Sequence, residues 1–404
     1  MLNLSARLGK QAIRACLGPE NSHRAQLLSL ALYLANYQSL KKPFDVFFYF
    51  GSRQWPTIKL VVEELIKRRD DLRVGLGSPW MKEEFADSLL LRGVPIIRVM
   101  PLRALRLFDT KILYTPLIGS FKMRQTEMPQ KARVVHALMS MNSLDATFGD
   151  SNFDSFDYIF CAGSHHIDSF RKSALRYPDL SGKLLIPAGY PKLDYMLASH
   201  SAKLRPTDPS VGSTVVYAPT HSVDGFNEYL ASLQYGEAII SALLAEGHRV
   251  IFRPHPASFS DHERPVIDRI CQLHADNPNF SLDANGDYTE SYSLADLMVT
   301  DLSGTGFTFS FSFCRPTIFF VPDIEAERGL SGPQFESRHR IGAVVRNIEE
   351  LIGKTAELCH RDMAEEIERF RDETVFNVGK SASYIVDCLE DILSGRERSE
   401  WVRL

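Results

Sequence analysis

The feature that most constrains the fold is a regular alternation of short β-rich runs with longer amphipathic runs. Successive strand, helix and strand patterns of this kind are typical of a parallel sheet whose strands are joined by crossover helices. In the first half of the chain the pattern covers residues 44–50, 55–70, 72–78, 81–93, 94–99, 111–117, 132–138, 156–162 and 165–177. The first half therefore predicts one doubly wound α/β domain.

A second alternation follows a break at residues 199–213, which gather Ser, Pro, Asp and Gly as connections between domains do. The pattern resumes at residues 214–220, 236–247, 248–254, 265–276, 279–283, 294–301, 306–314 and 316–322, and two helical stretches follow at 348–373 and 381–395. We expect a basic helical segment at 1–42, a Rossmann-like domain at 43–204, and a second Rossmann-like domain with terminal helices at 205–404. Two such domains facing a cleft are found in B-type nucleotide-sugar transferases (GT-B), in certain sugar epimerases and in two-domain binding proteins, so the fold alone does not select a function.

The composition is that of an ordinary soluble protein, with 44% hydrophobic and 24% charged residues. It argues against a coiled coil, a disordered chain or a nucleic-acid-coating protein. The formal charge of −4 is unevenly spread, because residues 1–42 carry +5 and the remainder carries −9. A basic helical segment of this kind can lie on an anionic membrane surface. The alternative is a surface helix packed on the first domain.

The sequence also predicts a cytoplasmic location. The six cysteines form no C-x-x-C pair, which is simplest in a reducing compartment. The longest apolar run of the N-terminal part, residues 27–35, has nine residues, whereas a spanning helix needs about twenty. Arg7, Lys10 and Arg14 interrupt any secretory signal. We therefore expect a cytoplasmic protein without a transmembrane helix, and its basic end offers one way to attach it to the inner face of the membrane.

Candidate site residues follow the predicted strands, because ligands of doubly wound sheets bind beyond the carboxyl ends of the strands. One strand ends at Arg253-Pro254-His255-Pro256. The prolines hold the backbone extended, and Arg253 adds a permanent cation two residues from the histidine. Such a pair can bind a phosphate or diphosphate and donate a proton to it. The alternative is a histidine that caps a turn.

A second strand, Leu297–Thr300, ends at Asp301, and Ser303, Gly304 and Thr305 lead into an apolar helix. Hydroxyls, glycines and backbone N–H groups at a helix N-terminus make an anion site. The loop is neither a Walker loop nor a G-x-G-x-x-G fingerprint. The alternative is that Ser303 is a simple N-cap and the glycines form a close-packed turn.

Two further signals are weaker. Thr220 and His221 follow the first strand of the second domain, where the opening loop would face the cleft. His136 lies at the end of a strand in the first domain, where a neutral imidazole could act as general base on an acceptor hydroxyl. Its alternative is a satisfied core histidine.

Other chemistries are not supported. The sequence contains no Asp-x-Asp, H-E-x-x-H, C-x-x-C or G-x-S-x-G motif, which argues against an A-type transferase metal site, a zinc hydrolase, a thiol redox centre and a serine hydrolase. The pair His165-His166 is expected near a helix terminus. We expect no metal and no cofactor.

Taken in order, these segments resemble the CDP-glycerol glycerophosphotransferase family, the teichoic-acid and capsule polyol-phosphate transferases. The resemblance covers roughly residues 130–350 as a succession of motifs. Its elements are the His136 segment, residues 156–170, the turn at 189–194, YAPTHS at 217–222, RPHP at 253–256, the loop at 301–309 with the following Arg-Pro, and PDIEAERGL at 322–330.

The resemblance implies a GT-B enzyme that is attached peripherally to the membrane and takes a CDP-activated donor to a surface-polymer or lipid-linked acceptor. His255 matches the family's His-Pro segment, whereas His136 matches its Trp-His-Gly segment only by position. The family's Asp-Tyr-Ser-Ser loop is Asp301-Leu302-Ser303-Gly304 here. The resemblance thus implies His136 and His255 as catalytic residues, with donor contacts from Arg253, Thr220, His221, Asp301, Ser303, Gly304, Thr305 and Arg328.

These observations lead to one hypothesis and three alternatives. We expect the donor diphosphate to rest on Arg253, His255 and the Ser303–Thr305 loop while His136 deprotonates the acceptor. One alternative is a GT-B glycosyltransferase that uses CMP-Kdo or another nucleotide sugar in capsule or lipopolysaccharide synthesis. The others are a UDP-sugar 2-epimerase and a non-catalytic nucleotide-binding protein. Nucleic acid is not an expected partner.

Overall fold

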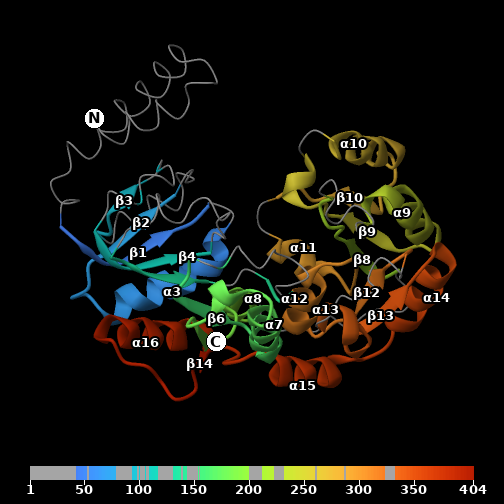
Figure 1. The fold of residues 1–404 in the computed structure, drawn as a ribbon. Helices are drawn as coiled ribbons and strands as arrows, with labels where there is room; N and C mark the ends of the chain where they lie inside the picture. The colour runs from blue at the N-terminus through green and yellow to red at the C-terminus, as the bar shows by residue number, and fades with distance from the viewer. Residues whose placement is uncertain are drawn as a thin grey trace, which may run out of the picture.

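The structure, a computed structural model, describes residues 42–404 except 52–53, 79–92, 98–99, 101–104, 106–108, 117–130, 138–139, 143–152, 154, 200–211, 223–231, 260–261, 286–287 and 324–332. Figure 1 shows two α/β parts, each built around its own sheet. The basic segment at 1–42 and most of the connection at 199–213 lie outside the described residues. Among the described residues, no helix combines the length and the apolar character that crossing a membrane requires.

The first sheet has the order β14-β7-β6-β5-β4-β1-β2-β3. Its strands are β1 (Phe44–Tyr49), β2 (Val74–Gly77), β3 (Ile96–Ile97), β4 (Thr110–Thr115), β5 (Arg133–His136), β6 (Tyr158–Cys161), β7 (Leu184–Pro187) and β14 (Val402–Arg403). In the centre Val46 of β1 lies opposite Val74 and Ile112 of its two parallel neighbours. Because β1 is buried on both faces, it is a nearly continuous apolar run and does not alternate with polar residues.

The second sheet has the order β10-β9-β8-β11-β12-β13, and its neighbouring strands pair parallel. Its strands are β8 (Thr214–Tyr217), β9 (Arg249–Phe252), β10 (Phe280–Leu282), β11 (Leu297–Thr300), β12 (Thr317–Phe320) and β13 (Gly342–Val345). The chain runs outward from β8 to β9 and β10, then returns to the other side of β8 as β11. The strand order therefore reverses between β8 and β11, and ligands of open α/β sheets bind beyond the carboxyl ends of the strands at such a point.

Helices cover both sheets. The first part carries α3 (Trp55–Arg68), α7 (Ser164–Ala174) and α8 (Pro191–Ser199), with the short η7 (Pro178–Leu180). The second carries α9 (Gly236–Ala245), α10 (Arg264–Leu273), α11 (Thr289–Leu294), α12 (Gly304–Phe313), α13 (Pro333–Glu336), α14 (Ile348–Leu358) and α15 (Ala364–Thr374), with η8 (Leu233–Tyr235), η9 (Pro256–Phe259) and η11 (Arg338–Arg340). The two predicted doubly wound domains are thus both present.

Helix α12 is unusual because its Phe-Thr-Phe-Ser-Phe-Ser-Phe sequence has the period of a strand. Almost every one of its residues is buried, so no polar face is needed. The hydroxyls of Thr308 and Ser312 donate to the carbonyls of Gly304 and Thr308, four residues earlier, at 3.0 and 2.7 Å. These bonds satisfy the buried hydroxyls inside the helix itself, which lets polar residues occupy an apolar environment.

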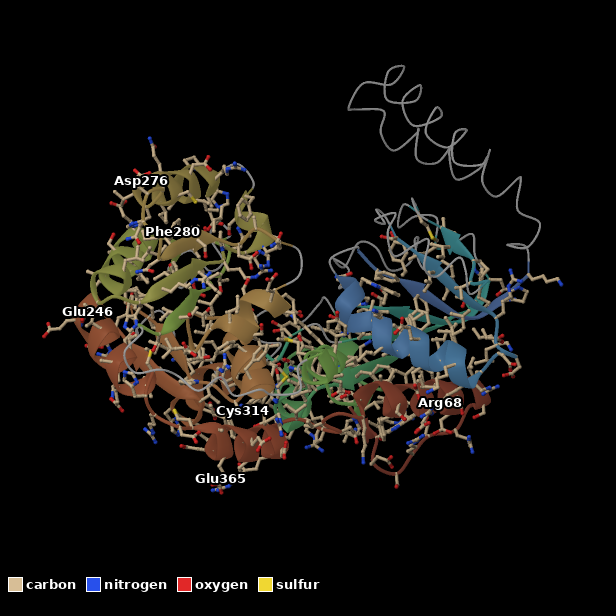
Figure 2. The ribbon with its side chains drawn as sticks, turned by 180° about the vertical axis from the view of Figure 1, so that it is seen from behind. Arg68, Glu246, Asp276, Phe280, Cys314 and Glu365 are labelled. Atoms are coloured by element: carbon tan, nitrogen blue, oxygen red, sulfur yellow. The ribbon has the colours of Figure 1, made fainter. Side chains whose placement is uncertain are left out.

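The last residues of the chain pack with the first domain, not with the second, where the sequence analysis placed them. Strand β14 pairs antiparallel with β7, and α16 (Ser381–Ser394) packs on α3. Ile385, Leu389 and Ile392 of α16 are fully buried in the core of the first sheet. Figure 2 shows Arg68 of α3 beside this helix, where its guanidinium donates to Asp387. The apolar face of α16 therefore needs the first domain to be covered.

Candidate functional site

The sequence-predicted residues of the second domain meet at the carboxyl ends of three adjacent strands. Thr220 and His221 follow β8, Arg253 and His255 follow β9, and Asp301 begins the loop after β11. Because β9, β8 and β11 are neighbours in the sheet, the three loops lie side by side at the point where the strand order reverses. This edge of the sheet is the candidate site.

Asp301 connects the loop after β11 to the Thr220 loop after β8. Its side chain is fully buried, and its carboxylate accepts from the backbone N–H groups of Thr220 and Ser232 at 3.0 and 2.7 Å and from both of their hydroxyls. Burial raises the pKa of Asp301, and these hydrogen bonds oppose that rise. The contacts of Asp301 therefore support a role in positioning the Thr220 loop.

The loop after Asp301 presents the N-terminus of α12 to the site. Ser303 is the N-cap, and its hydroxyl accepts from the backbone N–H of Thr305 at 3.2 Å. Ser303 and Thr305 are both partly exposed, whereas Gly304 between them is buried. The ten-residue helix directs its positive dipole end and the N–H groups of its first turn toward this loop, which favours an anion there.

Gly304 lies where the two domains meet. A Cβ atom at this position would lie 2.8 Å from the side-chain oxygens of Ser140 and Asn142 in the first domain. Only glycine lets the loop after β5 approach the start of α12 this closely. The two loops are thereby fixed against each other.

His255 is exposed at the mouth of the site. Its Nδ1 accepts from the backbone N–H of Ala257 at 3.2 Å. A neutral imidazole that accepts at Nδ1 carries its proton on Nε2. The geometry thus gives His255 the tautomer that donates a hydrogen bond, or a proton, from Nε2.

His221 stands next to His255, with nearly parallel rings whose centroids are 5.9 Å apart. Its Nδ1 lies 2.6 Å from a carboxylate oxygen of Glu263, and the other oxygen of Glu263 accepts from the backbone and hydroxyl of Ser222 at 2.9 and 2.6 Å. Burial acts to raise the pKa of Glu263, but the hydrogen bonds from Ser222 and His221 outweigh it and lower that pKa. Glu263 is thus a fixed carboxylate that orients His221.

Arg253 is buried and paired, so it is not an open cation as the sequence suggested. One of its nitrogens lies 2.5 Å from Asp283, and another donates to the carbonyl of Asn285 at 2.9 Å. The charge of Arg253 also acts on the buried phenol of Tyr292, where it opposes the rise in pKa that burial causes. Arg253 therefore ties the end of β9 to the residues that follow β10, and the Asp283 carboxylate neutralises much of its charge.

Lys192 is a site residue that sequence reasoning missed. It is the second residue of α8 in the first domain, and its Nζ lies 4.5 Å from the ring centroid of Tyr288 in the second. Burial, and then repulsion from Arg253, lower the pKa of Lys192 to about 8. No carboxylate of the described residues lies within ion-pair distance of it. The turn at 189–194 was part of the family resemblance, but nothing in its sequence indicated that this lysine faces the other domain.

His136 lies apart from this group of residues. It ends β5, is 1% exposed, and packs edge-on against Phe153 and Phe156 with ring centroids 5.2 and 4.6 Å away. Burial lowers its pKa to about 3, and among the described residues neither ring nitrogen has a hydrogen-bond partner. The ring is therefore neutral and closed off from solvent like a core histidine, but its polar atoms are not satisfied.

The predicted pair His165-His166 does begin a helix, as expected. The ring of His166 accepts from the N–H of Ala162 at Nδ1 and contacts the carbonyl of Asn142 through Nε2, at 3.1 and 2.9 Å. His165 contacts the carbonyl of Met141 at 2.9 Å. The two rings thus hold the loop that touches Gly304.

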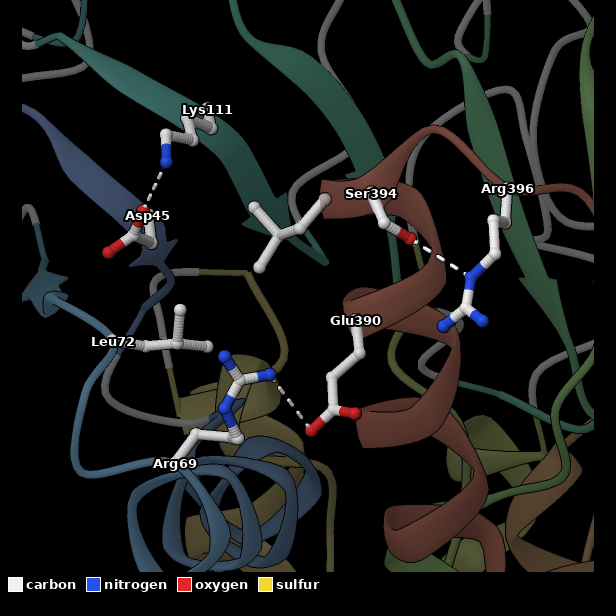
Figure 3. A pocket seen from close by; sticks show the side chains of 8 residues that line it. Asp45, Arg69, Leu72, Lys111, Glu390, Ser394 and Arg396 are labelled. Carbon is white, nitrogen blue, oxygen red and sulfur yellow. Dashed lines mark hydrogen bonds and ion pairs between the residues drawn. The ribbon is translucent and has the colours of Figure 1, made fainter.

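The pocket in Figure 3 lies elsewhere, with a volume of about 350 Å³. Asp45 and Lys111, 2.7 Å apart, lie at the starts of β1 and β4, and Arg69 pairs with Glu390 of α16 at 3.4 Å. This is the amino-terminal edge of the first sheet, opposite the edge where α/β sheets bind ligands. Its charges pair with one another, and the Arg69–Glu390 pair joins the end of α3 to α16.

The last predicted donor contact, Arg328, lies outside the described residues. The structure brings Thr220, His221, Arg253, His255, Asp301, Ser303, Gly304 and Thr305 to one sheet edge, and it places His136 in the core of the first domain.

Comparisons with known proteins identify a family whose model matches this chain. A family model described as CDP-Glycerol:Poly(glycerophosphate) glycerophosphotransferase matches residues 136–391, more than half of the chain. A teichoic acid poly(glycerol phosphate) polymerase of Bacillus subtilis (strain 168) is 26% identical over 219 residues, which cover 52% of this chain and 28% of the relative. The protein of the same name from Bacillus spizizenii is 22% identical over 244 residues, 57% of this chain and 58% of the relative. The matched regions thus span between about a quarter and just over half of these relatives.

Solved structures are similar in fold. The wall teichoic acid polymerase TagF is 15% identical with a TM-score of 0.55, covering 94% of this chain and 99% of that one. A putative UDP-N-acetylglucosamine 2-epimerase from Listeria monocytogenes is 12% identical with a TM-score of 0.60, covering 90% and 100%. At these identities the likeness concerns the fold alone, and it confirms the predicted two-domain GT-B architecture.

Proposed function

Because the chain belongs to the CDP-glycerol:poly(glycerophosphate) glycerophosphotransferase family, we propose that it transfers glycerol phosphate or a related polyol phosphate from a CDP-activated donor. The acceptor is a hydroxyl of a cell-surface polysaccharide or teichoic-acid-type polymer. The observation that carries the proposal is the convergence of the α12 N-terminus, exposed His255 and Lys192 at one edge of the second sheet. Helix dipole, N–H groups and cations together suit a diphosphate.

In this proposal the diphosphate lies across the Ser303–Thr305 loop. The acceptor hydroxyl attacks the phosphorus that bears the polyol, the P–O–P bond breaks, and CMP leaves with the bridging oxygen. His255 donates from Nε2 to the phosphate oxygen on which negative charge grows, and Lys192 balances that charge from the other domain. Asp301 and Arg253 hold the loops that make these contacts.

The proton of the acceptor hydroxyl needs a base, and His136 was the sequence-based candidate. A base is most effective when its pKa is near the working pH, whereas the pKa of His136 is about 3. Its ring would also have to leave the Phe153 and Phe156 contacts to reach a substrate. We propose instead that His136 supports the loop after β5 and that the proton of the attacking hydroxyl passes to water. The variant His136→Asn then loses stability more than turnover, and a folded, stable variant without turnover would restore the base assignment.

The decisive experiment is a donor panel. The protein is incubated with CDP-glycerol, CDP-ribitol, CMP-Kdo and UDP-sugars, with and without a polyol-phosphate or polysaccharide acceptor, and the released nucleotide is identified. Acceptor-dependent release of CMP from a CDP-polyol supports the proposal. Release of CMP from CMP-Kdo alone indicates the sugar transferase, and conversion of a UDP-sugar without acceptor indicates the epimerase. Either of these two results contradicts the proposal, and so does the absence of nucleotide release from every donor.

The variant His255→Ala tests the site. His255 is exposed and contacts the backbone of Ala257 and the ring of His221, so its removal should leave the unfolding free energy within about 0.5 kcal/mol of wild type. We expect turnover with the active donor to fall by about 100-fold or more, the usual contribution of a positioned proton donor. Near-wild-type turnover would remove His255 from the mechanism.

The cytoplasmic location and the membrane contact are also part of the proposal. The support is the charge of +5 on residues 1–42, a segment suited to anionic lipid. Deletion of residues 1–30 should abolish sedimentation with vesicles rich in phosphatidylserine or phosphatidylglycerol, while vesicles of neutral lipid serve as the control. Unchanged binding of the shortened chain to anionic vesicles contradicts this assignment.

A further inference from the structure

A cluster of nitrogen and oxygen donors lies beside the proposed donor site. The side chains of His221, His262 and Glu263 each place one such atom within 4.8 Å of the other two. His221 comes from the loop after β8, and the other two residues directly precede α10. The centroids of the two imidazole rings are 5.5 Å apart. Two independent segments therefore place three metal-binding groups within reach of one cation.

We propose that His221, His262 and Glu263 bind a divalent first-row transition cation of the zinc type. Two imidazoles and one carboxylate are the donor set of one class of catalytic zinc sites, which keep a further position open. Magnesium and calcium prefer sites made of oxygen alone, so they suit this cluster less well. The sequence contains no short metal-binding motif and so led us to expect no metal, whereas these two histidines are separated by forty residues and meet only in the folded chain.

The surroundings support the carboxylate as a ligand. Ser222 donates to one oxygen of Glu263 through its backbone N–H and its hydroxyl, at 2.9 and 2.6 Å, which leaves the second oxygen directed at His221. Hydrogen bonds of this kind orient the ligands of metal sites. The 2.6 Å separation of His221 and Glu263 is that of a shared proton, and ligands of a tetrahedral zinc lie roughly 3.3 Å apart. The cation would displace that proton while the exposed His262 rotates inward.

The position of the site suggests what the cation does. The ring of His221 stacks on that of His255, so the charge would lie beside the residue that we assign to the donor phosphates. With three protein ligands, the open position is available to water or to a phosphate oxygen. Only this last contact depends on the proposed function, since the metal site itself is formed by the protein alone.

The test measures metal binding without any substrate. The full chain is stripped of metal and titrated with Co²⁺, whose visible absorption intensifies in a low-symmetry protein site, and with Zn²⁺ by calorimetry. We expect one equivalent per chain, with affinity lowered about tenfold or more in His262→Ala and in Glu263→Gln. The matched control is His339→Ala, which removes an exposed histidine of η11 at the far edge of the same sheet. Circular dichroism checks that each variant is folded.

The outcomes separate this proposal from the proposed function. Absence of stoichiometric binding, or binding that His262→Ala and Glu263→Gln leave unchanged, overturns the metal site and leaves a hydrogen-bonded histidine and glutamate. Equal loss in His339→Ala overturns it as well. If the metal binds as expected and CDP-glycerol then alters the Co²⁺ spectrum, the donor contact is supported too. If the metal binds and no CDP-polyol alters the spectrum, the donor contact fails and the metal site stands.

Discussion

Replacement of Lys192 by methionine separates the effect of this cation on stability from its effect on donor affinity. Methionine keeps a long side chain over the Tyr288 ring and removes the charge. The variant should be more stable than the wild type at neutral pH and should bind the donor less tightly. Opposite effects of one substitution on stability and affinity are characteristic of a charge held in place for a ligand.

The stability effect follows from the pKa of Lys192. Burial lowers that pKa from 10.5 to about 8, and at about 1.4 kcal/mol per pH unit this amounts to a cost of about 3 kcal/mol for the charged form. The folded-state value lies below the unfolded-state value, so the cost is fully present below pH 8 and disappears as the pH rises toward 10.5. Loss of the contact between the ammonium and the Tyr288 ring offsets about 1 kcal/mol. We expect Lys192→Met to be stabilised by about 2 kcal/mol at pH 7, a gain that vanishes at high pH.

The affinity effect has the opposite sign. A hydrogen bond to a charged group contributes about 1.5–3 kcal/mol, so loss of the ammonium should weaken CDP-donor binding between about tenfold and a hundredfold. The wild type should also bind the donor less tightly as the pH rises through about 8, where the free protein loses this charge. In Lys192→Met that pH dependence should be absent. Urea unfolding and calorimetric titration with CDP-glycerol, both at a series of pH values, measure the two effects.

The matched control is Lys59→Met, which removes a lysine of α3 whose Nζ lies 5.9 Å from the ring centroid of Tyr195 in α8. It keeps donor affinity and its pH dependence unchanged. The reasoning about Lys192 is refuted if Lys192→Met binds the donor as tightly as the wild type. It is also refuted if the variant is less stable than the wild type at pH 7, since the charge then cannot be the costly group.

Three other substitutions test the framework of the site. Asp301→Ala removes the acceptor of four hydrogen bonds, two from buried Ser232 and two from partly buried Thr220, and should cost about 3 kcal/mol in urea unfolding. A loss below about 1 kcal/mol contradicts the role assigned to this carboxylate. Gly304→Ala places a Cβ 2.8 Å from two side-chain oxygens of the first domain, so it should lower the unfolding free energy by about 1–3 kcal/mol and should also lower turnover. Its control is Gly353→Ala, in open space within α14, which should raise the unfolding free energy by up to about 1 kcal/mol. The pKa of His136 is lowered from 6.5 to about 3 in the folded state, so the contribution of its neutral ring to stability is present above pH 6.5 and is lost as the pH falls. The wild type therefore loses unfolding free energy between pH 6.5 and about 4, and His136→Phe should make that loss smaller by about 3 kcal/mol. An unchanged loss in the variant contradicts the assignment.

The fold was largely predictable from the sequence, because hydrophobic periodicity is a local property. The β-rich runs at 44–50 and 248–252 are strands of two parallel sheets, and the loops beyond the strands of the second sheet do meet. The position of α16 could not be predicted in this way. Its apolar face would fit either domain, and only the three-dimensional path of the chain decides that it covers α3.

The sequence predicted which residues lie in the site better than it predicted their burial and their charge pairing. Arg253 has the sequence of an open cation, but its partner Asp283 lies thirty residues away at the end of another strand. His136 has the sequence of a cleft histidine, but Phe153 and Phe156 close over it. Lys192 carries no sequence signal, because its importance arises from Tyr288 and Arg253 of the other domain. Charge compensation and burial depend on contacts between distant segments, which spacing along the chain does not encode.

The contact at Gly304 connects the two halves of the proposed mechanism. The start of α12, which would hold the donor phosphates, touches the loop of Ser140 and Asn142. The rings of His165 and His166 fix that loop from the first domain. Helix α8, which carries Lys192, also packs on α12. The first domain therefore reaches the start of α12 through one loop and one helix, and a substitution in either should act on the anion site of the proposed mechanism as well as on stability.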